Sequence, residues 1–71
     1  MAATLSSPER IVNFIRKFSY DRHYAPSFRE IADAVGLSES TVAYHLGRLR
    51  DAGEVEYAHG ASRSVRIVSR G

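Results

Sequence analysis

The residues best suited to recognition chemistry lie on one face of a helix predicted within residues 36–53. Hydroxyl, carboxylate, phenol and guanidinium groups gather on this face, on Glu39, Ser40, Thr41, Tyr44 and Arg48. Such groups hydrogen-bond to base edges in the major groove of DNA, which admits a helix and where each base pair shows its own donor and acceptor pattern. A helix that only supports a core usually carries long, salt-bridged side chains instead. We therefore predict that these five residues, the recognition face, contact DNA bases.

A second set of residues is predicted to contact the sugar–phosphate backbone. Helix N-termini attract anions, and arginine near a hairpin tip can follow phosphates or enter a narrow minor groove. The set comprises Ser27, Phe28 and Arg29 at a helix start, His45 beside the recognition face, and His59, Ser62, Arg63 and Arg66 on or beside a hairpin. Other roles stay open: His45 could be a partly buried packing residue, and Glu39 could serve only the helix dipole. The hairpin arginines could protect a strand edge.

Three helices are predicted to carry these residues. Two of them begin with a capping box, in which Ser6 pairs with Glu9 and Ser27 pairs with Glu30 to satisfy free backbone donors. Apolar residues then recur at the helical spacing that marks a buried stripe. The three stripes are Ile11, Phe14, Ile15 and Phe18; Ile31, Ala32 and Val35; and Val42, Leu46 and Leu49. We expect the first helix to end near Tyr20.

The second and third helices are predicted to form a helix-turn-helix. Gly36 can take the left-handed conformation that ends the second helix. Leu37 and Val42 then flank Ser38, the N-cap of the third, as a hydrophobic staple. Two short helices joined by a glycine-initiated turn are typical of this motif.

A β-hairpin is predicted to follow, because apolar and polar residues alternate after residue 53. Val55 and Tyr57 mark one strand, Val65 and Ile67 mark the other, and a turn of roughly four to six residues joins them. The predicted fold class is therefore mostly α with a small β-hairpin, a three-helix winged helix-turn-helix. One domain covers residues 1–71, with an ordered core at about residues 6–68.

Composition argues against several other classes of protein. The chain has 71 residues, no cysteine and three histidines, so we predict one small domain with no metal or other cofactor. It contains no membrane-spanning run and no signal-peptide core, so we expect a cytoplasmic protein associated with the nucleoid. No nucleophile stands at a strained turn, and a small domain leaves little room for a pocket, so we predict neither catalysis nor a small-molecule ligand. The net charge is only +2, but arginine, which suits phosphate and guanine, supplies nearly all of the basic residues.

The chain resembles the N-terminal DNA-binding domain of LexA-type SOS repressors. The resemblance runs from Leu5 to Val68 and rests on Ser6-x-x-Glu9, Pro26-Ser27-x-x-Glu30-Ile31-Ala32, Gly36-Leu37, His45-Leu46 with Leu49, and Gly60-Ala61-Ser62-Arg63-Ser64-Val65-Arg66-Ile67. The stretch from Leu37 to Val55 is also similar to ArsR-like bacterial regulators. The resemblance implies a winged helix that binds DNA, without the linker and the Ser–Lys self-cleaving domain of the LexA type.

Two features differ from the LexA type. The turn before the third helix is one residue shorter, and Thr41, Val42 and Tyr44 replace the family's polar and acidic base-contacting residues. The family's base contacts are therefore not transferred to this chain. A free-standing small regulator and the DNA-binding part of a larger protein both fit the sequence.

Together, these observations predict sequence-specific binding to double-stranded DNA by a bacterial, phage or plasmid transcription regulator, most simply a repressor. The third helix would enter the major groove, and the hairpin would contact the backbone or the minor groove. One domain contacts one half-site, so a homodimer on a palindromic operator is an assembly that fits. Two alternatives remain: a winged helix that binds protein through Tyr44 and Arg48, or a shape-specific binder of RNA or non-B duplex in which Tyr44 stacks on a base.

Overall fold

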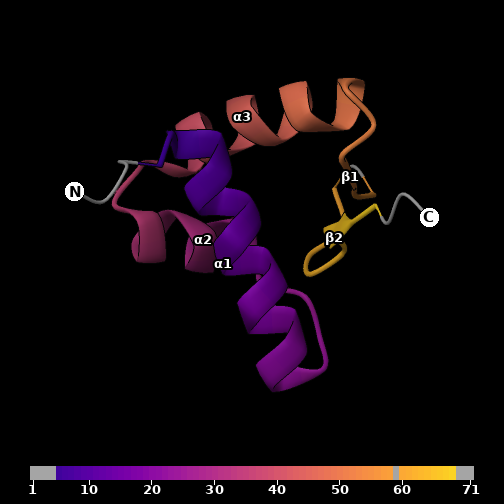
Figure 1. The fold of residues 1–71 in the computed structure, drawn as a ribbon. Coiled ribbons are helices and arrows are strands. Elements are labelled where there is room, and N and C mark those ends of the chain that lie inside the picture. The colour runs from indigo at the N-terminus through magenta and orange to yellow at the C-terminus, as the bar shows by residue number, and fades with distance from the viewer. Residues whose placement is uncertain (1–4, 59, 69–71) are drawn as a thin grey trace.

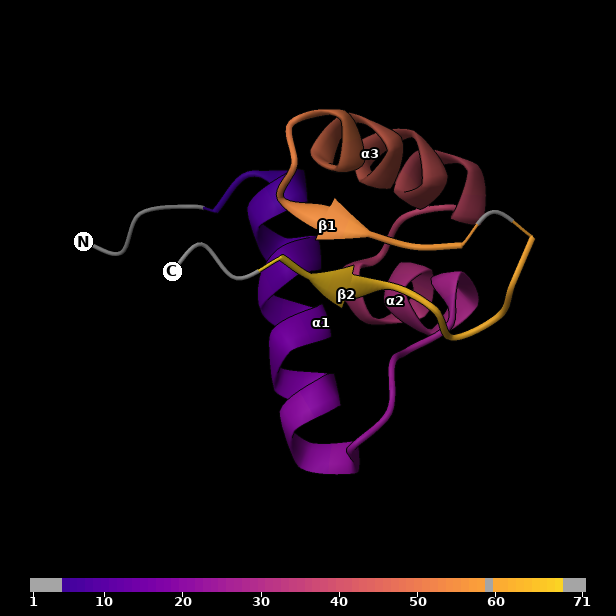
Figure 2. The same cartoon turned by 90° about the vertical axis from the view of Figure 1, so that its right-hand side faces the viewer.

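The structure, a computed structural model, describes residues 5–58 and 60–68. The described residues form helices α1 (Ser7–Arg22), α2 (Phe28–Val35) and α3 (Glu39–Asp51) and strands β1 (Val55–Glu56) and β2 (Arg66–Ile67) (Figure 1). The two strands pair antiparallel, and the hairpin lies across α1 with β1 nearer to α3 (Figure 2). The predicted fold class, three helices with a small β-hairpin, is confirmed.

Both predicted capping boxes are present. At the start of α1, the Ser6 backbone N–H donates to Glu9 Oε1 at 3.0 Å, and the Glu9 N–H donates to Ser6 Oγ at 3.4 Å. At the start of α2, the corresponding distances between Ser27 and Glu30 are 2.8 and 3.1 Å. Each box satisfies two backbone donors that a helix start otherwise leaves without partners.

Helix α1 is longer than predicted, ending at Arg22 rather than near Tyr20. An ion pair between Lys17 Nζ and Asp21 Oδ2, 3.2 Å apart and one turn along the helix, supports this last turn. The helix ends where His23 takes a left-handed conformation, with φ of 63°, and donates its backbone N–H to Ser19 O at 2.9 Å. Glycine usually fills this position, so the sequence carried no clear signal for the end.

The turn between α2 and α3 follows the prediction. Gly36 has φ of 73° and ends α2, and its N–H and that of Leu37 both donate to Ala32 O, at 2.9 and 3.0 Å. Ser38 then caps α3 by accepting from the Thr41 N–H at 3.1 Å. The tight turn fixes α3 relative to α2, which is what a helix-turn-helix requires.

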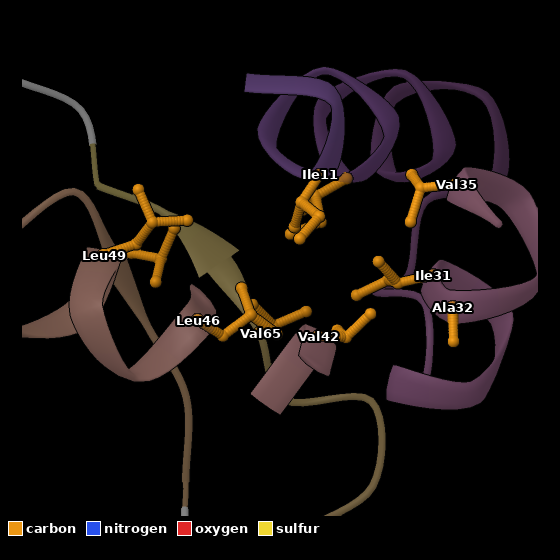
Figure 3. Close-up of a cluster of buried hydrophobic side chains, with 10 residues drawn as sticks. Ile11, Ile31, Ala32, Val35, Val42, Leu46, Leu49 and Val65 are labelled. Atoms are coloured by element: carbon orange, nitrogen blue, oxygen red, sulfur yellow. The ribbon is translucent and has the colours of Figure 1, made fainter. Parts of the chain in front are cut away.

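The apolar stripes of the three helices meet in one core, which the hairpin closes from the side (Figure 3). The core residues are Ile11, Ile15, Ile31, Ala32, Val35, Val42, Leu46, Leu49, Val55 and Val65. Phe14, predicted for the stripe of α1, is only partly buried and packs against this cluster. Phe18 is buried further along α1, between the rings of Phe14 and Tyr24 at centroid distances of 5.6 and 5.5 Å.

The hairpin has shorter strands and a longer connection than the alternation predicted. Only two residues of each strand pair, Val55 with Ile67 and Glu56 with Arg66. The connection is closed by a side chain rather than by a longer ladder, since Ser64 Oγ accepts from the Ala58 N–H at 2.9 Å. The predicted backbone contact His59 lies outside the described residues. Within the described ranges, no helix has the length and apolar character needed to cross a bilayer.

Candidate nucleic-acid interface

The predicted recognition face lies on the side of α3 that points away from the core. Val42 and Leu46, on the inner side, are fully buried, whereas the recognition-face residues are exposed, apart from the half-buried Thr41. The Thr41 hydroxyl accepts a hydrogen bond from Ser38 Oγ at 2.9 Å and keeps its own proton to donate. The buried stripe therefore fixes the helix, and its polar side is free to approach a ligand.

Tyr44 and Arg48 form a pair on this face. Arg48 Nη1 donates to Tyr44 Oη at 3.2 Å, and the guanidinium carbon lies 5.8 Å from the centre of the phenol ring. The His45 ring also contacts the Tyr44 ring, edge to face, with the two ring centroids 5.4 Å apart. Tyr44 nevertheless remains 59% exposed. The contact holds the phenol and the guanidinium together, while most of their hydrogen-bonding capacity still faces solvent.

The predicted backbone contacts come from different elements, and the fold brings several of them to one groove. The groove has a volume of about 360 Å³ and runs between the hairpin loop and the starts of two helices. Its lining includes Ser27, the N-cap of α2, Phe28 and Arg29 from α2, Glu39 from α3, and Ser62 and Arg63 from the loop. Figure 2 shows the loop beside the starts of α2 and α3. The N-terminal end of the recognition face is therefore adjacent to the predicted backbone contacts.

The two predicted wing arginines are each paired with a carboxylate. Arg66 donates through Nη2 to Glu56 Oε1 on the opposite strand. Arg63 turns toward α2, where Nη1 donates to Glu30 Oε1 at 2.6 Å and to Ala25 O at 3.2 Å. Exposed ion pairs of this kind are weak, so pairing alone does not prevent either guanidinium from binding a phosphate.

Electrostatics around Glu30 reflect this pairing. The hydrogen bond from Arg63 and the backbone N–H of Ser27 hold the pKa of the Glu30 carboxyl below its ordinary value. The same carboxylate raises the pKa of the Arg63 guanidinium. Both shifts favour the charged forms of the two side chains, so the ion pair is compatible with neutral pH.

A stack that the sequence did not predict joins the hairpin to α2 and α3. The Arg50 guanidinium lies over the Tyr57 ring at 4.9 Å, and the Tyr57 ring meets the Phe28 ring edge-on at 5.3 Å. Gly47 of α3 lies on the same side, since a Cβ there would stand 3.8 Å from Tyr57 Oη. This is an ordinary contact distance, so the glycine gave no signal of the stack.

Possible metal ligands do not converge in the part of the chain that the structure describes. No group of three or more histidine, cysteine, aspartate or glutamate side chains is placed there to hold an ion. Buried side-chain polar atoms of the described residues all have hydrogen-bond partners. The distinctive chemistry of the described surface is therefore the polar face of α3 and the groove beside it.

The arrangement of three helices with a recognition helix and a paired hairpin defines the winged helix-turn-helix class. Residues 5–64 match the model of the LexA DNA binding domain, and the chain belongs to this family. It is 41% identical over 70 residues to the LexA repressor of Brevibacillus brevis, covering 97% of this chain and 34% of that protein. It is 43% identical over 60 residues to the LexA repressors of Staphylococcus aureus and Staphylococcus epidermidis, covering 83% of this chain and 29% of each relative. The chain thus spans about a third of the length of these relatives.

Proposed function

We propose that this chain is the DNA-binding part of a transcription repressor and that it recognises a specific double-stranded sequence. The observation that carries the proposal is the exposed polar face of α3, held by a fully buried stripe on the opposite side of the same helix. Membership of the LexA DNA binding domain family and likeness to proteins named as repressors support it. Such a protein acts in the cytoplasm, at the nucleoid.

In this proposal, α3 enters the major groove with its N-terminal end leading. Glu39, Ser40 and Thr41 then reach base edges first, and Tyr44 and Arg48 reach bases one or more turns further along. A phenol and a guanidinium together can donate to guanine or accept from an amine, and each good bidentate contact is worth about 1–3 kcal/mol of discrimination. Glu39 also borders the groove of the wing, so it would face the DNA at the junction of base and backbone contacts.

Backbone contacts come from the groove and its surroundings. The start of α2, at Ser27, Phe28 and Arg29, presents helix-dipole charge and an exposed arginine, and Ser62 faces it across the groove. His45 and Arg66 would contact phosphates at the margins, as would His59. Such contacts orient the protein on the duplex without reading its sequence.

The decisive experiment is selection of bound sites from a pool of random duplex DNA. Enrichment of one motif, with binding that weakens steeply as salt is raised, supports the proposal. An inverted repeat in that motif supports a homodimer on a palindromic operator, because each domain contacts one half-site. Recovery of unenriched sequence, or no binding to duplex DNA at low salt, would contradict the proposal and favour a protein-binding winged helix.

A further inference from the structure

We propose that Arg63 is a positioning residue that holds the wing loop, residues 60–64, against the start of α2 through its contact with Glu30. This inference rests on the proposed DNA-binding function and deepens it. The sequence alone suggested that Arg63 touches DNA directly; the structure assigns it to the support of those residues that do. The position of the wing loop at DNA then depends on the contacts of one side chain, of which the ion pair with Glu30 is one.

The backbone of Arg63 is the first observation. Its φ is 56°, in the left-handed region that residues with a side chain rarely adopt. Among the described residues only His23, at the end of α1, is another non-glycine residue with positive φ. A non-glycine residue in this region persists when its surroundings hold it there, which directs attention to the contacts of its side chain.

Those contacts reach a part of the chain more than thirty residues away. The guanidinium donates to Glu30 Oε1 at 2.6 Å and to Ala25 O at 3.2 Å, and its carbon lies 5.0 Å from the centre of the Tyr24 ring. Arginine suits this role, because its planar group can donate to two acceptors and stack on an aromatic face at once. Pro26, between these partners, is fully buried, so the surface that receives Arg63 is fixed.

Glu30 connects this contact to the helix-turn-helix. The oxygen that accepts from Arg63, Oε1, also accepts from the Ser27 backbone N–H at 2.8 Å in the capping box of α2. One carboxylate oxygen thus binds both the start of α2 and the wing. A shift of the wing loop therefore changes the position of residues that line the groove together with Ser27.

Little else holds this loop in place. Of its described residues, Arg63 is the one whose side chain hydrogen-bonds outside the hairpin, since Ser64 Oγ bonds only to Ala58 and Ala61. The paired strands are two residues long, and the buried Val65 anchors the base of the hairpin rather than the loop. Without Arg63, the loop keeps its own turn but loses its attachment to α2.

Glu30→Gln separates positioning from direct contact. Glutamine can complete the capping box, since the motif uses Glu or Gln at this position, but it has no charge for the ion pair. If Arg63 positions the wing, Glu30→Gln weakens binding to the selected duplex about two- to fivefold, the size that an exposed ion pair supports. If Arg63 instead binds phosphate, Glu30→Gln frees its guanidinium and removes a negative charge near DNA, so binding becomes tighter.

Asp33→Asn is the matched control, because it removes the same charge from an exposed position on the same helix. We expect it to leave binding unchanged or slightly tighter. Arg63→Ala should weaken binding. The double variant Arg63→Ala with Glu30→Gln should bind no more weakly than Arg63→Ala alone, because Glu30 acts on the wing loop through Arg63. Binding is measured where circular dichroism shows each variant to be folded.

Tighter or unchanged binding by Glu30→Gln, relative to Asp33→Asn, overturns the positioning role. So does additivity of the two substitutions in the double variant. If Arg63→Ala does not fold, the comparison of Glu30→Gln with Asp33→Asn still decides the matter by its sign. Failure of the unsubstituted protein to bind any selected duplex would refute the proposed function instead, so the two failures are distinguishable.

Discussion

Tyr44→Ala should change which DNA sequences the protein binds while leaving its stability nearly unaltered. Tyr44 is 59% exposed, and its contacts with Arg48 and His45 lie on the surface. Substitutions at such positions usually change the free energy of unfolding by no more than about 0.5 kcal/mol. Loss of a base contact, in contrast, removes about 1–3 kcal/mol of discrimination, which is roughly a 5- to 150-fold loss of preference for the selected site over random duplex.

Val42→Ala, on the inner side of the same helix, provides the opposite case. Val42 is fully buried, so removal of two methyl groups costs about 1.6 kcal/mol in transfer energy, and the remaining cavity adds to this cost. We expect a lower free energy of unfolding but an unchanged ratio of specific to random binding in the folded protein. Urea unfolding and fluorescence anisotropy, on selected and on random duplexes, measure the two quantities separately.

A base-contacting role for Tyr44 is refuted if Tyr44→Ala weakens binding to the selected and the random duplex by the same factor. In that case Tyr44 contributes to general affinity, and the exposed side of α3 does not read the sequence at this position. The division of roles between the two sides of α3 is refuted if Val42→Ala changes the ratio of specific to random binding as strongly as Tyr44→Ala does. The buried and exposed sides of α3 would then not have the separate roles assigned to them.

Two further predictions concern stability. Gly47→Ala should raise the free energy of unfolding by about 0.5–1 kcal/mol in a urea titration, because alanine favours helix. The added Cβ would lie 3.8 Å from Tyr57 Oη, an ordinary contact distance. A loss of stability would show that the hairpin packs more tightly on α3 than this distance implies. The free energy of unfolding should also fall in acid, because hydrogen bonds lower the pKa of both Glu9 and Glu30 in the folded protein. The two carboxylates contribute their full stabilisation above the ordinary glutamate pKa of about 4.3. This stabilisation is lost as the pH falls through the lowered pKa values of the folded protein. Urea titrations at a series of pH values test this, and Glu30→Gln should make the profile shallower; an equally steep profile would contradict the link to Glu30.

The helices could be predicted from the sequence because their signals are local. A capping box spans four residues, and a buried stripe repeats within one or two turns, so Ser27, Glu30 and Val42 could be assigned from neighbours alone. The end of α1, in contrast, has no local signal in the sequence, so its predicted end near Tyr20 was wrong by two residues. His23 takes a conformation that the sequence usually marks with glycine, and only the structure shows it.

The recognition face could also be predicted, because helical periodicity fixes which residues of α3 lie opposite the core. The surroundings of that face could not. The contact between Arg63 and Glu30 joins residues 33 positions apart and depends on a left-handed backbone at Arg63. The stack of Arg50 on Tyr57 depends equally on how the hairpin returns across α3. In a region where pairing of the strands is so short, the residue types alone do not specify the path of the loop.

The two halves of the interface are therefore held by different forces. The recognition helix is fixed by buried apolar contacts, such as those of Val42 and Leu46, which neither salt nor protonation weakens directly. The wing loop is held by the contacts of Arg63, an exposed ion pair with Glu30 and a stack on the Tyr24 ring. Salt screens the ion pair, and protonation of Glu30 removes it. Under the proposed function, changes in ionic conditions should thus alter contacts made by the wing loop before they alter base contacts made by α3. Phosphate contacts dominate affinity and base contacts set sequence preference. A domain that binds DNA as proposed would therefore bind less tightly at high salt while keeping its preferred site.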